Sequence, residues 1–151
     1  MENSYRKIKK KILRLLGQDD FTEAVKEISG LPARKVINPL ISSLCSIDEK
    51  IQRRAAVAIG IITANLAEQD IESARVIMRR LMWSLNDESG GIGWGAPEAM
   101  AEIMARSKKL ADEYRKILIS YSEPGKNYFE HEGLQRSVRR GLERLACPFV
   151  G

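Results

Sequence analysis

The sequence predicts an all-α protein built from repeated helical hairpins. No segment alternates apolar and polar residues as a half-buried strand would, and an approximate repeat runs through the chain. Small and aliphatic residues at 58–60, 99–101 and 141–143 match at separations of 41 and 42 residues. Since a period of this length with two helices per unit is typical of α-solenoids, we expect a right-handed α-α superhelix of about four hairpins.

Capping residues and breaks in the apolar periodicity divide the chain into helices. Asp20, Asp48 and Asp70 each precede an amphipathic segment and are predicted N-caps, and Glu23 completes a capping box after Asp20. Gly30 is expected to close the helix that Asp20 opens, and Pro39 to bend or shorten the next one. The helices are expected within 1–16 and at about 21–28, 33–45, 49–67, 71–85, 98–105, 107–121 and 133–146.

A chain of 151 residues suits one domain with one core. We expect a single domain over 1–151, with a degenerate first repeat at 4–30 and further repeats at about 32–67, 70–107 and 108–147. Cys45 and Cys147 have no C-x-x-C spacing, so we expect reduced thiols, with Cys45 in a core. Neither a signal peptide nor a membrane-spanning run is recognisable, which predicts a cytoplasmic protein.

The positive charge of the chain is concentrated in its first helix. Of the 25 basic and 20 acidic residues, six basic and one acidic fall within 1–16, which leaves 19 of each sign in the remainder. The segment is expected to cover the end of the repeat stack with its polar side in water. The functional alternative is docking on anionic lipid or nucleic acid. Apolar residues recur on its other face at Tyr5, Ile8, Ile12, Leu15 and Leu16.

The second repeat resembles HEAT-like repeats of the phycobilisome-lyase type. In that pattern a leucine-rich helix is followed by a turn aspartate, a basic residue and alternating small residues. About 115 residues carry the resemblance, which implies a fold of stacked helical hairpins. Residues 79–103 also resemble a segment of uncharacterised bacterial HEAT-like proteins, and this implies no activity. The matching positions are Leu40, Leu44, Asp48, Arg54, Ala56, Ala58, Gly60 and Ile62.

Residues 86–96 form a glycine-rich connection between two predicted helices. Four glycines lie within 90–95, where we expect them to allow positive φ and close backbone approach. Amides ahead of the helix at Pro97 are candidates for anion binding. However, no strand precedes the loop, no Gly-Lys-Ser/Thr follows it, and two neighbouring carboxylates would repel a phosphate. Nucleotide binding is therefore disfavoured.

We expect this loop to be ordered and to face a protein partner, because ordered loops of its length are often functional. In the repeat register Trp94 takes the position of Arg53 and Arg136, where it either packs into the seam between repeats or faces the partner. The candidate partner-binding residues of the loop are Asp87, Glu88, Gly91, Gly93 and Trp94.

The last predicted helix carries arginines at positions i, i+4 and i+8: Arg136, Arg140 and Arg144. A solvated basic face is the expectation. Binding of an acidic or phosphate-bearing partner is the alternative, with Arg136 and Arg140 as candidate contacts. The lone histidine, His131, is expected to be a solvated or capping residue. Several large side chains of the third unit are expected in the core: Met78, Met82, Trp83, Met100 and Met104.

Three functions remain open. The first is a non-catalytic protein–protein interaction module that uses the solenoid surface and the loop 86–96. The second is a nucleic-acid binder related to HEAT-like DNA-repair proteins, which the neutral charge of the chain beyond residue 16 disfavours. The third, suggested by the resemblance alone, is a chromophore lyase or another small-molecule-binding protein. No catalytic residue, cofactor or metal site is predicted.

Overall fold

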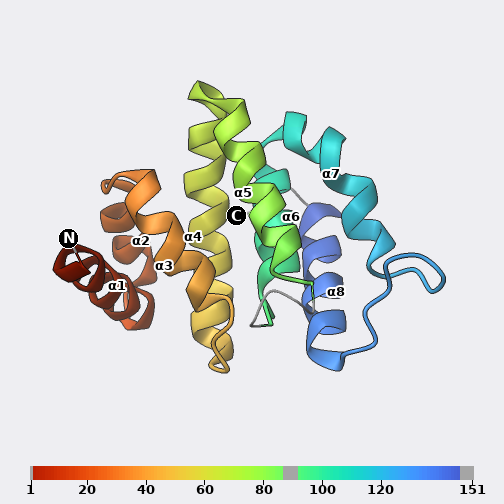
Figure 1. Cartoon of the computed structure of the whole chain (residues 1–151), viewed down its shortest axis with the longest axis horizontal. Helices are drawn as coiled ribbons and strands as arrows, with labels where there is room; N and C mark the ends of the chain where they lie inside the picture. Colours follow the sequence, from red (N-terminus) through yellow and green to blue (C-terminus); the bar gives the residue numbers. More distant parts are fainter. Residues whose placement is uncertain (1, 87–91, 147–151) are drawn as a thin grey trace.

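The computed structural model describes residues 2–86 and 92–146, and within these ranges every regular element is a helix (Figure 1). The predicted all-α class is therefore confirmed for the described residues. The helices are α1 (Glu2–Gly17), α2 (Phe21–Ser29), α3 (Ala33–Ser43), α4 (Glu49–Gln69), α5 (Ile71–Trp83), α6 (Ala96–Arg106), α7 (Lys108–Ser120) and α8 (Glu132–Ala146).

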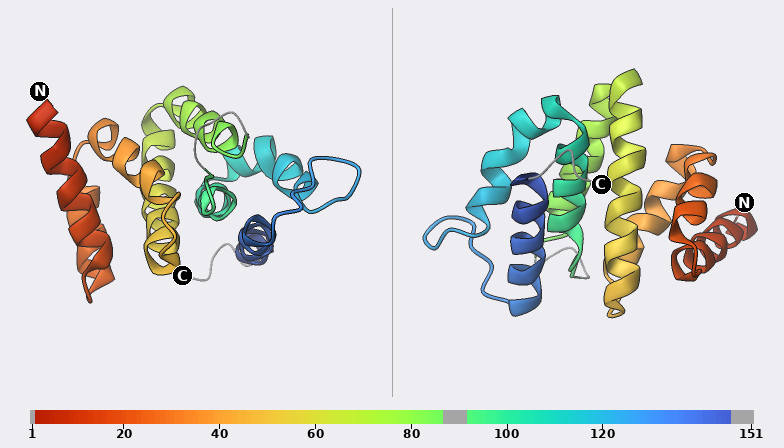
Figure 2. Two further views of the ribbon diagram at one scale, coloured as in Figure 1. Left: turned by 60° about the horizontal axis from the view of Figure 1, so that its bottom comes forward. Right: turned by 180° about the vertical axis from the view of Figure 1, so that it is seen from behind.

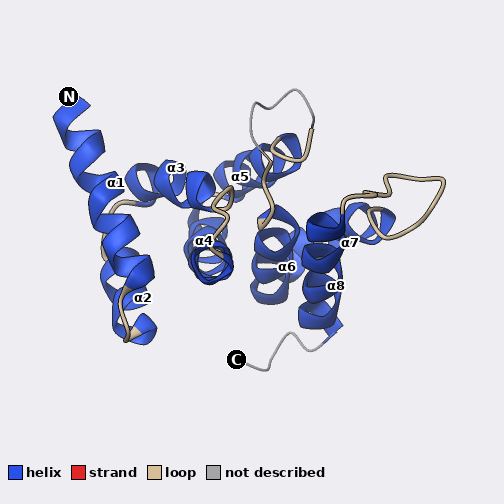
Figure 3. Cartoon of the chain, turned by 90° about the horizontal axis from the view of Figure 1, so that it is seen from below, coloured by secondary structure: helices blue, strands red, loops and turns tan. Residues whose placement is uncertain are grey.

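The helices lie in two layers. Seen from below, α3, α5 and α7 form one layer, which we call the outer layer, while α4, α6 and α8 lie side by side in the other, the inner layer (Figure 3). Consecutive helices pack across the layers, α3 on α4, α5 on α6 and α7 on α8. At the N-terminal end α1 packs on α2 and α3, as two further views also show (Figure 2). The most extensive helix–helix contacts join α4 to α6 and α6 to α8.

The predicted aspartate caps are in place. Asp20 accepts a hydrogen bond from the Glu23 amide at 3.1 Å, Asp48 from the Lys50 amide at 3.0 Å, and Asp70 from the Ser73 amide at 3.1 Å. Gly30 closes α2 as its C-cap, as expected, and does so with a right-handed φ of −79°. Pro39 does not shorten α3, which continues through it from Ala33 to Ser43.

Buried aliphatic side chains fill the space between the layers and extend to α1. Ile12, Leu15 and Leu16 are fully buried, so α1 covers the end of the core as expected. Tyr5 of the same helix is exposed instead of packed. In the inner layer, Arg54 of α4 donates to the carbonyl oxygens of Leu16 at 3.0 Å and Gln18 at 2.6 Å. These hydrogen bonds hold α4 against the end of α1.

Two predicted core positions lie at the surface. Cys45 is exposed, because it follows the last turn of α3 and its neighbour Leu44 takes the inward position. Trp83 is 54% exposed on α5, whereas Met78, Met100 and Met104 are buried and Met82 is half-buried. The apolar periodicity of α5 centres on Ala74, Met78 and Leu81, which turns Trp83 toward solvent.

Small residues set the spacing of the inner layer. A Cβ added at Gly60 of α4 would lie 2.5 Å from the Glu102 Cβ of α6. One added at Gly141 of α8 would lie 3.0 Å from the Pro97 carbonyl oxygen and 3.2 Å from the Ala101 Cβ. The backbones of α4, α6 and α8 thus approach at positions where larger side chains would separate them.

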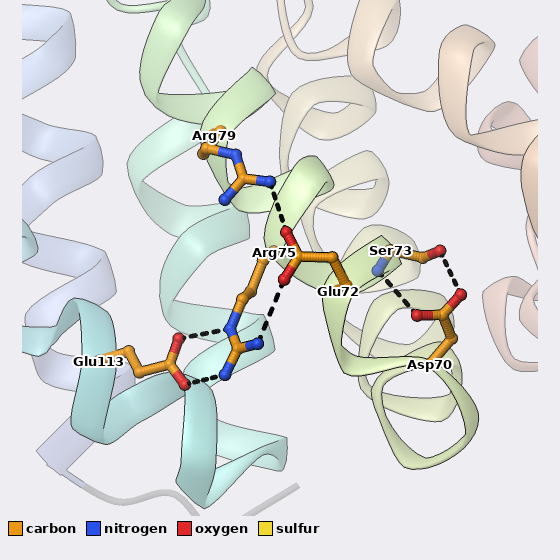
Figure 4. A network of polar contacts seen from close by, with 6 residues as sticks. All are labelled: Asp70, Glu72, Ser73, Arg75, Arg79 and Glu113. Carbon is orange, nitrogen blue, oxygen red and sulfur yellow. Dashed lines mark hydrogen bonds and ion pairs between the residues drawn. The ribbon is translucent and has the colours of Figure 1, made fainter.

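An ion-pair network joins α5 and α7 in the outer layer (Figure 4). The Arg75 guanidinium donates to both carboxylate oxygens of Glu113, at 2.9 and 2.8 Å, and also to Glu72 at 3.2 Å. Arg79 donates to the other Glu72 oxygen at 2.9 Å. Bidentate pairing fixes the relative position of two helices more sharply than a single contact does.

Within the described residues, no helix has the length and apolar character needed to cross a membrane.

The spacing of α4 and α6 predicts that Gly60→Ala lowers stability. Alanine would favour the helix itself, but the added methyl would clash with the Glu102 Cβ and backbone. We expect a loss of about 1–3 kcal/mol, as for overpacked cores, measured by thermal and urea unfolding. Gly17→Ala is the control, because a Cβ at Gly17 meets nothing within 4 Å. Equal stability of the Gly60 and Gly17 variants would contradict the close helix contact.

Candidate partner-binding site

The N-terminal ends of α4, α6 and α8 lie along one edge of the molecule, the lower edge in Figure 1. A pocket of about 300 Å³ opens at this edge, and we call it the edge pocket. Side chains from three separate parts of the chain line it. They include Ile47, Glu49 and Gln52 around the start of α4, Trp94 before α6, His131 just before α8, and Arg136 and Arg140 in α8.

Backbone hydrogen bonds hold the segment before α6 against its neighbours. The Gly93 amide donates to the Ser84 carbonyl at 3.2 Å, and the Gly95 amide donates to the Leu44 carbonyl at 3.2 Å. A Cβ at Gly93 would lie 2.5 Å from the Ser84 Oγ, and one at Gly95 3.0 Å from the Leu44 Cδ2. Neither glycine has positive φ; among the described residues only Gly125 does. Close approach, not a left-handed turn, therefore requires glycine here.

The amides that lead into α6 have internal partners. The Trp94 amide donates to Ile92, the Ala96 amide to Gly93, and the Glu98 amide to the Ser137 Oγ of α8 at 3.3 Å. Proline at position 97 has no amide hydrogen. The expectation of free amides for anion binding before Pro97 is therefore wrong for the described part of this loop, because carbonyl oxygens of the loop and the Ser137 hydroxyl accept these hydrogen bonds.

Trp94 is half-buried and forms one wall of the edge pocket. Its ring lies 4.5 Å from the His131 ring between centroids, at an interplanar angle of 58°. A Cβ at Gly133 would lie 3.0 Å from the Trp94 Cε3, so glycine at that position makes room for the indole. The side chain thus packs against Gly133 of α8 with one part and borders the pocket with another, and a partner-facing role stays a prediction.

The arginines of α8 differ in their surroundings. Arg140 pairs with Glu49 of α4 and, at 3.5 Å, with Glu98 of α6, and Arg144 pairs with Glu102 at 3.1 Å. The expected solvated stripe is therefore wrong for these two residues. Arg136 is exposed and has no carboxylate within salt-bridge distance among the described residues. It is the cation of the edge pocket that a ligand can reach.

Two carboxylates on α6 escaped sequence reasoning. Glu98 is 8% exposed and Glu102 9%, and both face the arginines of neighbouring helices. Arg53 of α4 reaches Glu98 at 3.5 Å, and Arg106 donates to Glu102 at 2.6 Å. One feature of the sequence could have indicated their burial. The two glutamates lie at i and i+4 in a helix whose other residues before Arg106 are small or apolar.

Burial and charge act in opposite directions on two glutamates of this network. Burial raises the pKa of the Glu98 carboxyl and outweighs the nearby Arg53 and Arg140, which lower it. At the rim of the pocket, hydrogen bonding and charge from Arg140 lower the pKa of the exposed Glu49. Arg140 therefore contacts two carboxyls whose pKa values are shifted in opposite directions. The pKa of Glu49 is lowered, and burial raises that of Glu98.

A second hollow continues along the inner face. This face pocket has a volume of about 560 Å³ and shares Glu49 with the edge pocket. Its lining includes Phe21 of α2, Arg53 and Val57 of α4, and Glu98 of α6. The guanidinium of Arg54 lies 4.9 Å from the Phe21 ring centroid, which keeps that ring against α4. The two pockets together give the inner layer an uneven, charged surface.

The structure brings together three of the predicted partner-binding residues, Trp94, Arg136 and Arg140, in the edge pocket. Gly93 does not line the pocket, and its amide donates to the Ser84 carbonyl. The remaining candidates, Asp87, Glu88 and Gly91, lie outside the described residues, as does Cys147. Sequence reasoning did not find Ile47, Glu49 or Gln52, because their relation to Trp94 arises only from the packing of α4 beside α6.

Comparison of the chain with protein-family models, with curated proteins and with solved structures finds no match. Within residues 2–86 and 92–146, no group of three or more His, Cys, Asp or Glu side chains is arranged to hold a metal ion. Functional inference therefore rests on the geometry of the pockets and helix faces.

The raised pKa of Glu98 predicts a pH-dependent effect of Glu98→Gln. Below the ordinary glutamate pKa of 4.5 the carboxyl is protonated in the folded and unfolded states, and glutamine resembles it. As pH rises, the unfolded chain ionises first, so wild type loses stability until the folded-state pKa is passed. The melting temperature of Glu98→Gln relative to wild type should therefore increase between pH 4.5 and neutrality.

Glu72→Gln provides a control of opposite sign. Hydrogen bonds from Arg79 and Arg75 lower the pKa of the exposed Glu72, so its ionised form stabilises the folded state above pH 4.5. That variant should lose stability relative to wild type as pH rises over the same range. If Glu98→Gln also lost stability relative to wild type as pH rises, the arginine pairs, and not burial, would dominate the pKa of Glu98.

Proposed function

We propose that this protein is a non-catalytic interaction module, a HEAT-like α-solenoid that binds a segment of a protein partner at the edge pocket. The observation that carries the proposal is the meeting of Trp94, Arg136 and Arg140 in one open pocket. These residues come from two segments about forty positions apart. Tryptophan and arginine, like tyrosine, are enriched among the residues that contribute most binding energy at protein interfaces.

The layered packing supports the solenoid part of the proposal. Helices pair across the two layers in chain order, and α4, α6 and α8 repeat side by side (Figure 3). The closest contacts involve Gly60, Ala101 and Gly141, which belong to the segments that match at separations of 41 and 42 residues. A right-handed superhelix of about four hairpins accounts for both the sequence period and this packing.

The chemistry of the edge pocket favours a peptide that carries an apolar side chain next to an acidic one. Trp94 and Ile47 offer apolar surface, and Ile47 is 96% exposed. Arg136 offers a guanidinium to a carboxylate, and Gln52 adds a neutral polar group to the lining. A volume of about 300 Å³ is at the lower limit for small-molecule sites, and it suits one or two side chains.

Selection from a displayed library of random peptides tests this proposal while the natural partner is unidentified. Selection on the wild-type protein should enrich peptides with an apolar residue beside Asp or Glu. For such a peptide, Arg136→Glu should weaken binding by roughly tenfold or more, because it replaces attraction by repulsion. Binding can be measured by isothermal calorimetry, and the melting temperature should stay unchanged because Arg136 is exposed.

Arg139→Glu is the matched control. It makes the same charge change on α8, but Arg139 is exposed and does not line the edge pocket. Trp94→Ala is a less selective probe, because it also removes the contacts with His131 and Gly133. Failure to enrich acidic–apolar peptides, or equal loss of binding in the Arg136 and Arg139 variants, would reject the edge pocket as the binding site.

A further inference from the structure

The exposed side of α1 carries cations that have no carboxylate partner in the described part of the chain. Lys11 of the same helix pairs with Glu27 of α2 at 3.4 Å, and most arginines of the inner face are paired as described above. The exposed basic side chains of α1 without such a pair are Arg6, Lys7, Lys9, Lys10 and Arg14.

Helix geometry arranges this exposed side in two neighbouring lines, because positions i, i+4 and i+8 lie one above another. One line contains cations only, and it extends over about 12 Å at 1.5 Å per residue. The second line combines a cation with an apolar side chain that is 45% exposed. The first line is Arg6, Lys10 and Arg14, and the second is Lys9 and Leu13.

This surface is available in the folded protein. The opposite face of α1 holds Ile12, Leu15 and Leu16, which are fully buried against the core. Helix α1 also lies at one end of the molecule, red in Figure 1, so its outer side is not covered by another described helix. A large partner can therefore approach the two lines without displacing α1 from the fold.

We propose that this face of α1 docks the folded protein on a bilayer that contains anionic phospholipid. The cations would lie among the phosphate groups, where the negative surface potential attracts lysine and arginine. Leu13 would enter the boundary between headgroups and acyl chains, a place that suits aliphatic side chains. A nucleic-acid backbone would attract the same cations, but it offers no apolar environment for Leu13. The mixed line therefore favours lipid over nucleic acid.

Vesicle co-sedimentation tests this proposal, which does not depend on the edge pocket. The full chain is mixed with vesicles of phosphatidylcholine alone or of phosphatidylcholine and phosphatidylserine in equal amounts, at low and at physiological salt. We expect binding only to the anionic vesicles, and weaker binding at the higher salt. The double variant Lys9→Glu/Lys10→Glu should lower the vesicle partition coefficient at least tenfold.

Two further variants test whether vesicle binding depends on this face of α1 or only on the net charge of the protein. Arg115→Glu/Lys116→Glu makes the same charge change at exposed positions of α7 and should leave most of the vesicle binding intact. Leu13→Gln keeps every charge and should lower vesicle binding severalfold. Circular dichroism should give unchanged melting temperatures for these variants, since all five residues are exposed.

Three results would overturn the proposal. The first is no binding of the wild-type chain to anionic vesicles at low salt. The second is equal loss of binding in the α1 and α7 charge variants. The third is vesicle binding that Leu13→Gln does not weaken. Titration with duplex DNA under the same conditions identifies the competing partner: tighter binding to DNA than to vesicles, lost in Lys9→Glu/Lys10→Glu and unchanged in Leu13→Gln, would assign the face to nucleic acid.

Discussion

The close approach of α4, α6 and α8 is the constraint on which the remaining structure depends. Gly60 leaves no space between α4 and Glu102 of α6, and Gly141 brings α8 against the carbonyl of Pro97. Because the helix axes are so near, the side chains of α6 cannot spread into solvent and must meet those of both neighbours. The two glutamates of α6 are thereby nearly buried, and they are tolerated because arginines from α4 and α8 reach them from either side.

This arrangement explains why most arginines of the inner face, in the described part of the chain, are paired within the fold. Arg53, Arg140 and Arg144 each contact a glutamate of another helix, and Arg54 donates to carbonyl oxygens at the end of α1. These arginines act within the fold as links between helices distant in sequence. In the described part of the chain, the cations best placed for an outside partner are therefore those on α1 and Arg136 of the edge pocket.

The two proposed surfaces occupy different parts of the molecule. The edge pocket lies where α4, α6 and α8 begin, and the basic face lies on α1 at the N-terminal end (Figure 1). A peptide in the pocket would therefore not compete for space with a bilayer on α1. Taken together, the two proposals describe an adaptor that holds a protein segment near an anionic surface. Each surface can fail without the other, since they share no residue.

The sequence by itself determined the helical class, the aspartate caps at 20, 48 and 70, and the small residues that let the inner helices meet. These features depend on local hydrogen bonds and on periodicity, which neighbouring residues specify. Only the tertiary structure decided that Cys45 and Trp83 face solvent, that Glu98 and Glu102 are buried, and that Trp94 meets His131 and Arg136 in one pocket. It also replaced the expected positive φ at Gly93 by close contact with Ser84. The burial of the two glutamates and the meeting of Trp94 with His131 and Arg136 depend on contacts between residues about forty positions apart. How closely whole helices pack determines these contacts, and local patterns do not encode it.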